Sequence, residues 1–293
     1  MFVDRRLTIG SEMILITGAT GHIGRELVAE LDRAGVPMRF FVRDPARAAD
    51  LPSSAERVVG DLTDPAALRD ACEGIDSLFL LVPGLAVEPA RYAVMAARHA
   101  GIRHLVLVSS YNVLGDPMPA MGRWHHERED IVGSSGMSAT ILRPGGFMTN
   151  ALEWAPDIRA GRPVFDPTGP GRYAPIDPAD IAAVAAIALT EPGHDTTYCL
   201  TGEQTFTIGE QVAVLAGALG RTITVETATT AEEAVRSRYP QGAPPALAAA
   251  ILEGFTLMRA DTVGLRTDTV RRLLGRAPRT FADWCDRNRD RFR

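Results

Sequence analysis

Short apolar runs alternate with amphipathic segments through the first half of the chain. Each run is only a few residues long, and most are followed by a stretch whose apolar residues recur three and four positions apart. We predict strands at residues 13–16, 39–42, 57–59, 77–82, 105–108 and 138–142. We predict helices at residues 24–34, 65–72, 89–100 and 125–134. Strands separated by helices in this rhythm indicate right-handed βαβ units, so we predict an α/β fold with a doubly wound parallel sheet.

The pattern loosens after residue 144. Residues 156–175 are rich in Pro, Gly and Asp, which is typical of surface loops and at most one short strand. Beyond them the periodicity predicts helices at 180–189, 207–219 and 242–258 and a strand at 222–226. The alanine-rich helix at 242–258 either covers a pocket or packs against a second copy of the chain in a homodimer.

The composition excludes several classes of protein. Of 293 residues, 46% are hydrophobic and 23% charged, which is ordinary for a soluble globular protein. The formal net charge of −5 gives no reason to expect nucleic acid or an anionic membrane as a partner, and no apolar run is long enough to span a bilayer. Three widely spaced cysteines form neither a disulfide nor a metal-ligand pattern, so we expect a cytoplasmic protein without a metal site.

A glycine-rich turn follows the first predicted strand. Residues 17–24 read Thr-Gly-Ala-Thr-Gly-His-Ile-Gly, between an apolar strand and an amphipathic helix. Glycines at this spacing let backbone N–H groups approach a pyrophosphate, and the positive end of the helix adds to the attraction. We therefore predict dinucleotide binding, with contacts from Gly18, Thr20, Gly21, His22, Ile23 and Gly24.

The residues after the second predicted strand bear on the choice of dinucleotide. Arg43 comes directly after the strand, where an arginine suits the 2′-phosphate of NADP. Asp44 lies about 20 residues beyond Gly24, where an acidic residue serves NAD, but it is also well placed to cap the turn before Pro45. We predict a preference for NADP(H) over NAD(H), with Arg47 either assisting Arg43 or lying on a solvated face.

Two further residues are predicted to contact the adenine. Asp61 and Leu62 follow the third predicted strand, where Asp61 meets the adenine amino group and Leu62 its ring. The alternative for Asp61 is a helix N-cap, a role that Asp64 fills better because Pro65 follows it directly.

Several motifs together resemble one superfamily. They are the turn TGATGHIG at 17–24, GDLTD at 60–64, LVLVSS at 105–110 and TILRPGGFMTN at 140–150. The chain resembles the short-chain dehydrogenase/reductase superfamily over roughly residues 13–290, and within it the atypical NmrA-like branch. That branch includes NADPH-dependent quinone reductases, reductases of aromatic natural products and NADP sensors without turnover.

The pattern of elements predicts a domain layout, to which the resemblance adds cofactor contacts. We expect an N-terminal extension at 1–12, an NAD(P)-binding Rossmann domain at 13–150, and a smaller substrate-side lobe at 151–293 that is interleaved with the sheet. The resemblance adds cofactor contacts from Leu81, Val82, Pro83, Ser109, His125, Pro144 and Gly145.

The catalytic positions of the superfamily are only partly present. The resemblance places Ser110 where a serine polarises the substrate carbonyl. It places Met121 at the position of the proton-donating tyrosine and His125 at that of its lysine, and no lysine occurs in the chain. The usual Tyr-Lys relay is therefore missing. Tyr111 offers a phenol from another direction, or packs in the interior with its hydroxyl satisfied.

One pair on the predicted helix resembles the quinone reductases. His125 is followed four residues later by Glu129, on the same helical face, so that Glu129 is placed to orient the imidazole. His125 then binds the nicotinamide ribose or passes a proton. A surface histidine beside a carboxylate is the structural alternative, and the neighbouring His126 is an alternative for the functional residue.

Soft apolar residues surround the expected reaction site. Met118, Met121, Trp124, Phe147 and Met148 suit a flat aromatic substrate, or form lid packing without a ligand. We predict an NADP(H)-dependent oxidoreductase that transfers hydride to a quinone or another aromatic or conjugated carbonyl substrate. The alternatives are an NADP-binding redox sensor that acts through a partner, and an isomerase or dehydratase on the same fold.

Overall fold

A computed structural model describes residues 12–238, 241–260 and 264–293. The predicted extension at 1–12 lies outside the described residues except for Glu12. The chain forms two compact units, each made of three segments. The first comprises Met1–Val113, Gly122–Arg143 and Pro178–Cys199, and the second Leu114–Met121, Pro144–Asp177 and Leu200–Arg293. Neither unit is continuous along the chain.

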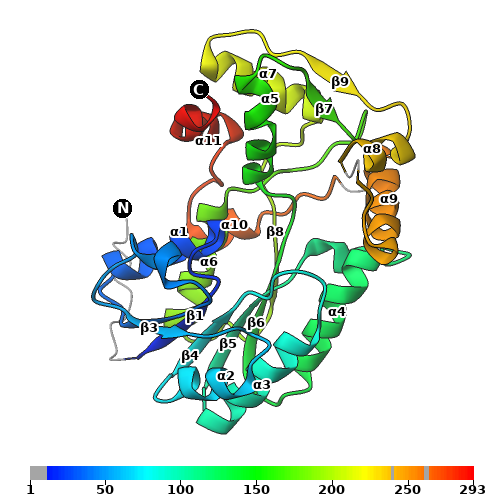
Figure 1. The fold of residues 1–293 in the computed structure, drawn as a ribbon. Helices are drawn as coiled ribbons and strands as arrows, with labels where there is room; N and C mark the ends of the chain where they lie inside the picture. The colour runs from blue at the N-terminus through cyan, green and yellow to red at the C-terminus, as the bar shows by residue number, and fades with distance from the viewer. Residues whose placement is uncertain (1–11, 239–240, 261–263) are drawn as a thin grey trace. The chain divides into compact units, whose positions relative to one another are not determined.

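A seven-stranded sheet has the order β3-β2-β1-β4-β5-β6-β8 (Figure 1). Its strands are β1 (Ile14–Thr17), β2 (Met38–Val42), β3 (Glu56–Val59), β4 (Ser77–Leu80), β5 (His104–Val108), β6 (Ser138–Pro144) and β8 (Thr197–Leu200). Strands β1 to β6 pair in parallel, and their order reverses between β1 and β4. The predicted doubly wound sheet is thereby confirmed. The edge strand β8 has no counterpart among the predicted strands.

Helices cover both faces of this sheet. They are α1 (His22–Arg33), α2 (Pro65–Cys72), α3 (Glu88–Ala100), α4 (Ala120–Gly133) and α6 (Pro178–Thr190). Figure 1 shows α1 and α6 together on one face and α2, α3 and α4 on the other. Strand residues such as Leu15, Phe79 and Leu107 are fully buried between these layers, which explains why the strands read as continuous apolar runs.

The second unit has its own hydrophobic core. Its elements are η3 (Met148–Trp154), α5 (Ala155–Arg159), β7 (Val164–Asp166), α7 (Ile208–Leu219), β9 (Val225–Thr227), α8 (Ala231–Arg238), α9 (Pro245–Arg259), α10 (Thr269–Leu274), α11 (Phe281–Asn288) and η4 (Arg289–Phe292). Strands β7 and β9 pair in parallel. Phe281 stacks on Trp284 with ring centroids 5.6 Å apart, and Phe292 meets Trp284 edge-on.

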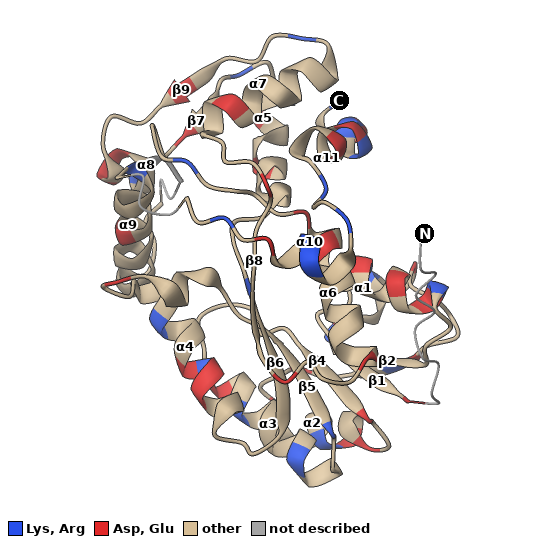
Figure 2. Cartoon of the chain, turned by 180° about the vertical axis from the view of Figure 1, so that it is seen from behind, with Lys and Arg blue, Asp and Glu red and all other residues tan. Residues whose placement is uncertain are grey.

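Helix α9 is the predicted alanine-rich helix, and it is almost uncharged (Figure 2). Its carboxylate, Glu253, accepts a hydrogen bond of 2.7 Å from the backbone N–H of Ala120. At its carboxyl end Arg259 donates to the carbonyls of Pro167 and Thr229. Hydrogen bonds therefore connect the middle of this apolar helix to Ala120 and its carboxyl end to Pro167 and Thr229. Within the described ranges, no helix is long and apolar enough to cross a membrane.

The end of α9 leaves no room for a side chain at Gly171. A Cβ there would lie 1.9 Å from the carbonyl oxygen of Met258. We expect Gly171→Ala to destabilise the protein by about 2 kcal/mol, because the helix end must move to relieve the overlap. Thermal unfolding followed by circular dichroism measures this as a lowered Tm.

Gly217→Ala in α7 is the matched control. A Cβ there meets no atom within 4 Å, so the same substitution is expected to stabilise the helix by roughly 0.5–1 kcal/mol. Equal Tm values for the two variants would contradict the close approach at Gly171.

Candidate functional site

The turn between β1 and α1 has the geometry of a phosphate site. Gly18 has φ of +69°, and the N–H of Gly21 donates to its carbonyl at 3.0 Å. A Cβ on Gly24 would lie 2.1 Å from that same carbonyl oxygen, so only glycine allows the helix to approach so closely. Helix α1 has no side-chain cap at Gly21, which leaves N–H groups of its first turn available to an anion.

The two charged residues after β2, Arg43 and Asp44, have different environments. The Arg43 side chain is 68% exposed, and its Nε lies 3.8 Å from a carboxylate oxygen of Asp61. Asp44 instead caps the short helix η1 (Pro45–Ala48), accepting from the N–H of Ala46 at 3.0 Å. The capping role predicted for Asp44 is confirmed, and its carboxylate is already in use.

Asp61 is held beside Arg43 by its own turn. One of its oxygens accepts from the backbone N–H and the hydroxyl of Thr63, at 2.9 Å and 2.7 Å. These bonds, with a smaller effect from Arg43, lower the pKa of Asp61. Asp64 is the N-cap of α2, as predicted. Leu62 is half-buried and packs against the core of the first unit.

The two serines after β5 have different environments. Ser109 is buried, its hydroxyl donates to Glu129, and its N–H donates to the carbonyl of Leu142. Both hydrogen-bond donors of Ser109 are therefore in use, so a cofactor contact of Ser109 must use one of its oxygens as an acceptor. Ser110 is half-buried and its oxygen accepts from the N–H of Asn112 at 3.2 Å. The hydroxyl proton of Ser110 can still be donated to a ligand.

Glu129 does not orient His125 as the sequence suggests. Its oxygens are taken by Ser109 of the β5 end and by Arg143 of β6, whose Nε donates at 2.9 Å. The Glu129 side chain is only 9% exposed, so this network is nearly dry and ties α4 to two strand ends. The sequence signal for this partner was the single arginine at the end of the sixth strand, Arg143.

The two neighbouring histidines of α4 have different environments. The Nδ1 of His125 is buried, and it has no hydrogen-bond partner among the described residues. Burial, with a further effect from the charge of Arg128, lowers the pKa of His125 to about 4, although Glu129 opposes the shift. The imidazole is therefore neutral at pH 7. His126 instead pairs with Asp130 at 3.0 Å on the surface of α4.

The other predicted site residues fall in both units. In the first, Leu81 and Val82 follow β4, Tyr111 begins the short helix η2 (Tyr111–Leu114), and Trp124 is half-buried on α4. In the second, Met118 and Phe147 are half-buried, Met121 is exposed, and Pro144 and Gly145 are buried. Met148 is only 2% exposed inside the core of the second unit, so its role is packing rather than substrate contact.

Burial disfavours the thiolate form of all three cysteines. Burial raises the pKa of Cys72 to about 11 and that of Cys285 to about 12, and it also raises the pKa of the half-buried Cys199. In the part of the chain that the structure describes, no cluster of His, Cys, Asp and Glu is arranged to hold a metal ion.

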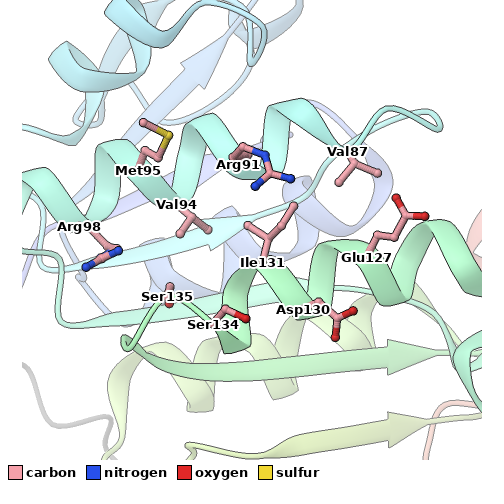
Figure 3. Close-up of a pocket in the computed structure, with 10 residues that line it drawn as sticks. All are labelled: Val87, Arg91, Val94, Met95, Arg98, Glu127, Asp130, Ile131, Ser134 and Ser135. Carbon is pink, nitrogen blue, oxygen red and sulfur yellow. The ribbon is translucent and has the colours of Figure 1, made fainter.

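A groove between α3 and α4 lies apart from these residues. It is lined by side chains of both helices and the residues next to them, among them Arg91, Met95, Glu127 and Ile131 (Figure 3). None of the predicted cofactor or catalytic residues lines it.

Known proteins are similar over almost the whole chain. Residues 18–192 match the family described as NAD(P)H-binding. An NAD(P)H azoreductase of Xenophilus azovorans is 37% identical over 93% of this chain and 96% of its own. A (4-alkanoyl-5-oxo-2,5-dihydrofuran-3-yl)methyl phosphate reductase of Streptomyces griseus is also 37% identical, over 96% of this chain and 99% of its own.

A solved structure of an NADPH-dependent oxidoreductase is also similar to this chain over almost its whole length. The NADPH-dependent quinone oxidoreductase of Escherichia coli in complex with NADPH has a TM-score of 0.81 and 27% identity, covering 94% of this chain and 99% of its own. The phosphate turn, the sheet order and the relatives lead to one conclusion. The chain belongs to the NAD(P)H-binding family and is an NAD(P)H-dependent oxidoreductase of the atypical, NmrA-like short-chain dehydrogenase/reductase type.

Proposed function

We propose that this protein uses NADPH in preference to NADH to reduce a quinone or another flat, conjugated acceptor. The observation that carries the proposal is that the usual tyrosine and lysine of the proton relay are missing. The chain has no lysine, Met121 stands where the superfamily has its tyrosine, and His125 is neutral. A conjugated acceptor suits such a site, because its reduced form delocalises negative charge and needs no strong acid. The azoreductase and quinone oxidoreductase relatives are named for acceptors of this kind.

Residues of the first unit are proposed to hold the cofactor. The N–H groups at the start of α1 and the turn at Gly18 fit the pyrophosphate, and Arg43 fits the 2′-phosphate. Asp61 and Leu62 are proposed to contact the adenine, and His125 the nicotinamide ribose. When bound, NADPH supplies the hydride.

Substrate contacts are proposed for Ser110 and for apolar side chains. The Ser110 hydroxyl donates a hydrogen bond to the acceptor oxygen and stabilises the charge that develops there. A neutral His125 acts as a hydrogen-bonding group rather than as a charged acid. We propose Met118, Met121, Trp124 and Phe147 as side chains that contact the flat face of the acceptor.

Turnover with a panel of simple and polycyclic quinones tests the function. NADPH oxidation by the purified protein is expected, at a kcat/KM at least about 10-fold above that with NADH, because a charge-assisted contact is worth roughly 1.5–3 kcal/mol. Ser110→Ala should lower kcat by about 100-fold with little change in the KM for the quinone. Ser54→Ala, an exposed serine in a loop, is the control. NADPH binding without turnover of any quinone would refute the proposed acceptor class.

The preference for NADPH is tested at Arg43. We expect Arg43→Ala to weaken NADPH binding by roughly 10-fold or more and to leave the Kd for NADH within about 2-fold, because only NADPH carries the 2′-phosphate. Calorimetric titration measures both constants. Arg33→Ala, which removes an equal charge from the far end of α1, should change neither. Equal losses of affinity for NADPH and NADH in Arg43→Ala would show that Arg43 does not contact the 2′-phosphate.

The charge state of His125 is a further test. Its lowered pKa means that the unfolded chain binds more protons than the folded one between about pH 4 and 6.5, so His125 favours folding more strongly as pH rises through that window. NMR titration of the His125 ring should give a midpoint near 4 in the folded protein and near 6.5 in urea. A folded midpoint at 6 or above would show that the ring is hydrated and available as an acid.

A further inference from the structure

Arg128 is the one fully buried arginine among the described residues, and it has an unusual set of partners. Its side chain lies inside the first unit at 1% exposure. The guanidinium donates to three backbone carbonyls, those of Val82 at 3.2 Å, Gly84 at 2.6 Å and Ala86 at 2.9 Å. No carboxylate pairs with it in the described part of the chain. A buried cation without a counter-ion is costly, so carbonyl dipoles must compensate for the lost water.

The three carbonyls belong to one short segment, residues 81–87, which we name the β4 loop. They alternate along the chain, so the loop curves around the guanidinium, and Gly84 takes a positive φ of +72° in this curve. A planar fork of donors suits such an arrangement, whereas a point charge does not. Arg128 therefore fixes the backbone of the loop rather than a single side chain.

The other end of the β4 loop is attached to the phosphate turn. The N–H of Leu81 donates to the hydroxyl oxygen of Thr17 at 2.8 Å, directly before Gly18. Leu81 also packs against Gly18, where an added Cβ would lie 3.5 Å from its side chain. The loop thus runs from the turn that receives the pyrophosphate to helix α4.

The β4 loop lies at the carboxyl end of β4, at a place in the sheet where cofactors bind in folds of this type. Strands β1 and β4 are the neighbours between which the strand order reverses, and dinucleotides bind at such a switch point, outside the carboxyl ends of the strands. We propose that Arg128 is a positioning residue, which holds the β4 loop in the conformation that receives the nicotinamide half of the cofactor. This inference rests on the proposed binding of NADPH.

The placement of His125 supports the same role. His125 precedes Arg128 by three residues on α4, so both side chains lie on one side of the helix. The charge of Arg128 contributes to the low pKa of His125, while Glu129, which opposes it, is shared with Ser109 and Arg143. One buried cation therefore acts on two neighbouring parts of the site, the loop backbone and the imidazole.

Binding of two probes separates positioning from general damage. The full cofactor NADPH contacts the β4 loop, whereas adenosine 2′,5′-bisphosphate carries only the adenosine half. We expect Arg128→Met to raise the Kd for NADPH by at least about 10-fold and to leave the Kd for the bisphosphate within about 2-fold of the wild-type value. Calorimetric titration measures both constants. Arg123→Met, an exposed arginine of the same helix, should change neither constant. Unchanged NADPH affinity in Arg128→Met would overturn the inference, as would equal losses for both probes.

A conservative variant provides a readout without any cofactor. Arg128→Lys keeps the charge but lacks the fork, so we expect amides of residues 82–86 to exchange hydrogen at least about 10-fold faster in the free protein, with exchange in β1 unchanged. If Arg128→Met does not fold, Arg128→Lys becomes the deciding variant. The inference is overturned if Arg128→Lys exchanges these amides at the wild-type rate and binds NADPH with the wild-type affinity. A wild-type protein that binds neither probe would instead refute the proposed function, and the inference with it.

Discussion

The constraint on which the rest of the framework depends is the contact between the first helix and the turn that precedes it. The carbonyl of Gly18 lies where a side chain on Gly24 would be, so the start of α1 rests directly on the end of β1. This contact directs the uncapped end of the helix over the carboxyl edge of the sheet. Thr17 and Leu81 extend it to the next strand, and Arg128 extends it to α4. A series of contacts thus fixes the backbone from the glycine-rich turn, through the segment that follows β4, to helix α4.

The sequence predicts most of this framework because burial on both faces leaves a clear signal. Strands β1 to β6 and helices α1 to α4 were all predicted, since continuous apolar runs and 3.6-residue periodicity arise from the layers themselves. Local capping was also predictable, as Asp44 and Asp64 show. The edge strand β8 was missed, because a strand with one neighbour and partial exposure has no such pattern.

What the sequence does not predict is which polar groups meet across the fold. Spacing on one helix places Glu129 beside His125, yet the carboxylate turns to Ser109 and Arg143, which lie on other elements. The two donors outcompete a neutral imidazole, because a charge-assisted bidentate bond is the stronger one. Met148 was misplaced for a related reason, since periodicity cannot distinguish a core side chain from a pocket side chain. The assembly of each unit from three separate segments likewise depends on contacts between residues that are distant in the sequence.

The absence of lysine has a consequence beyond the missing relay. Quinones are electrophiles that add to amines and thiolates, and an enzyme that binds them is exposed to alkylation by its own substrate. Side chains of this protein offer no primary amine, and its cysteines are held as neutral thiols by burial. Arginine provides every permanently positive side chain and cannot lose its proton to become a comparable nucleophile. The chain therefore lacks the lysine amines, and suppresses the thiolates, with which its proposed substrates would react most readily.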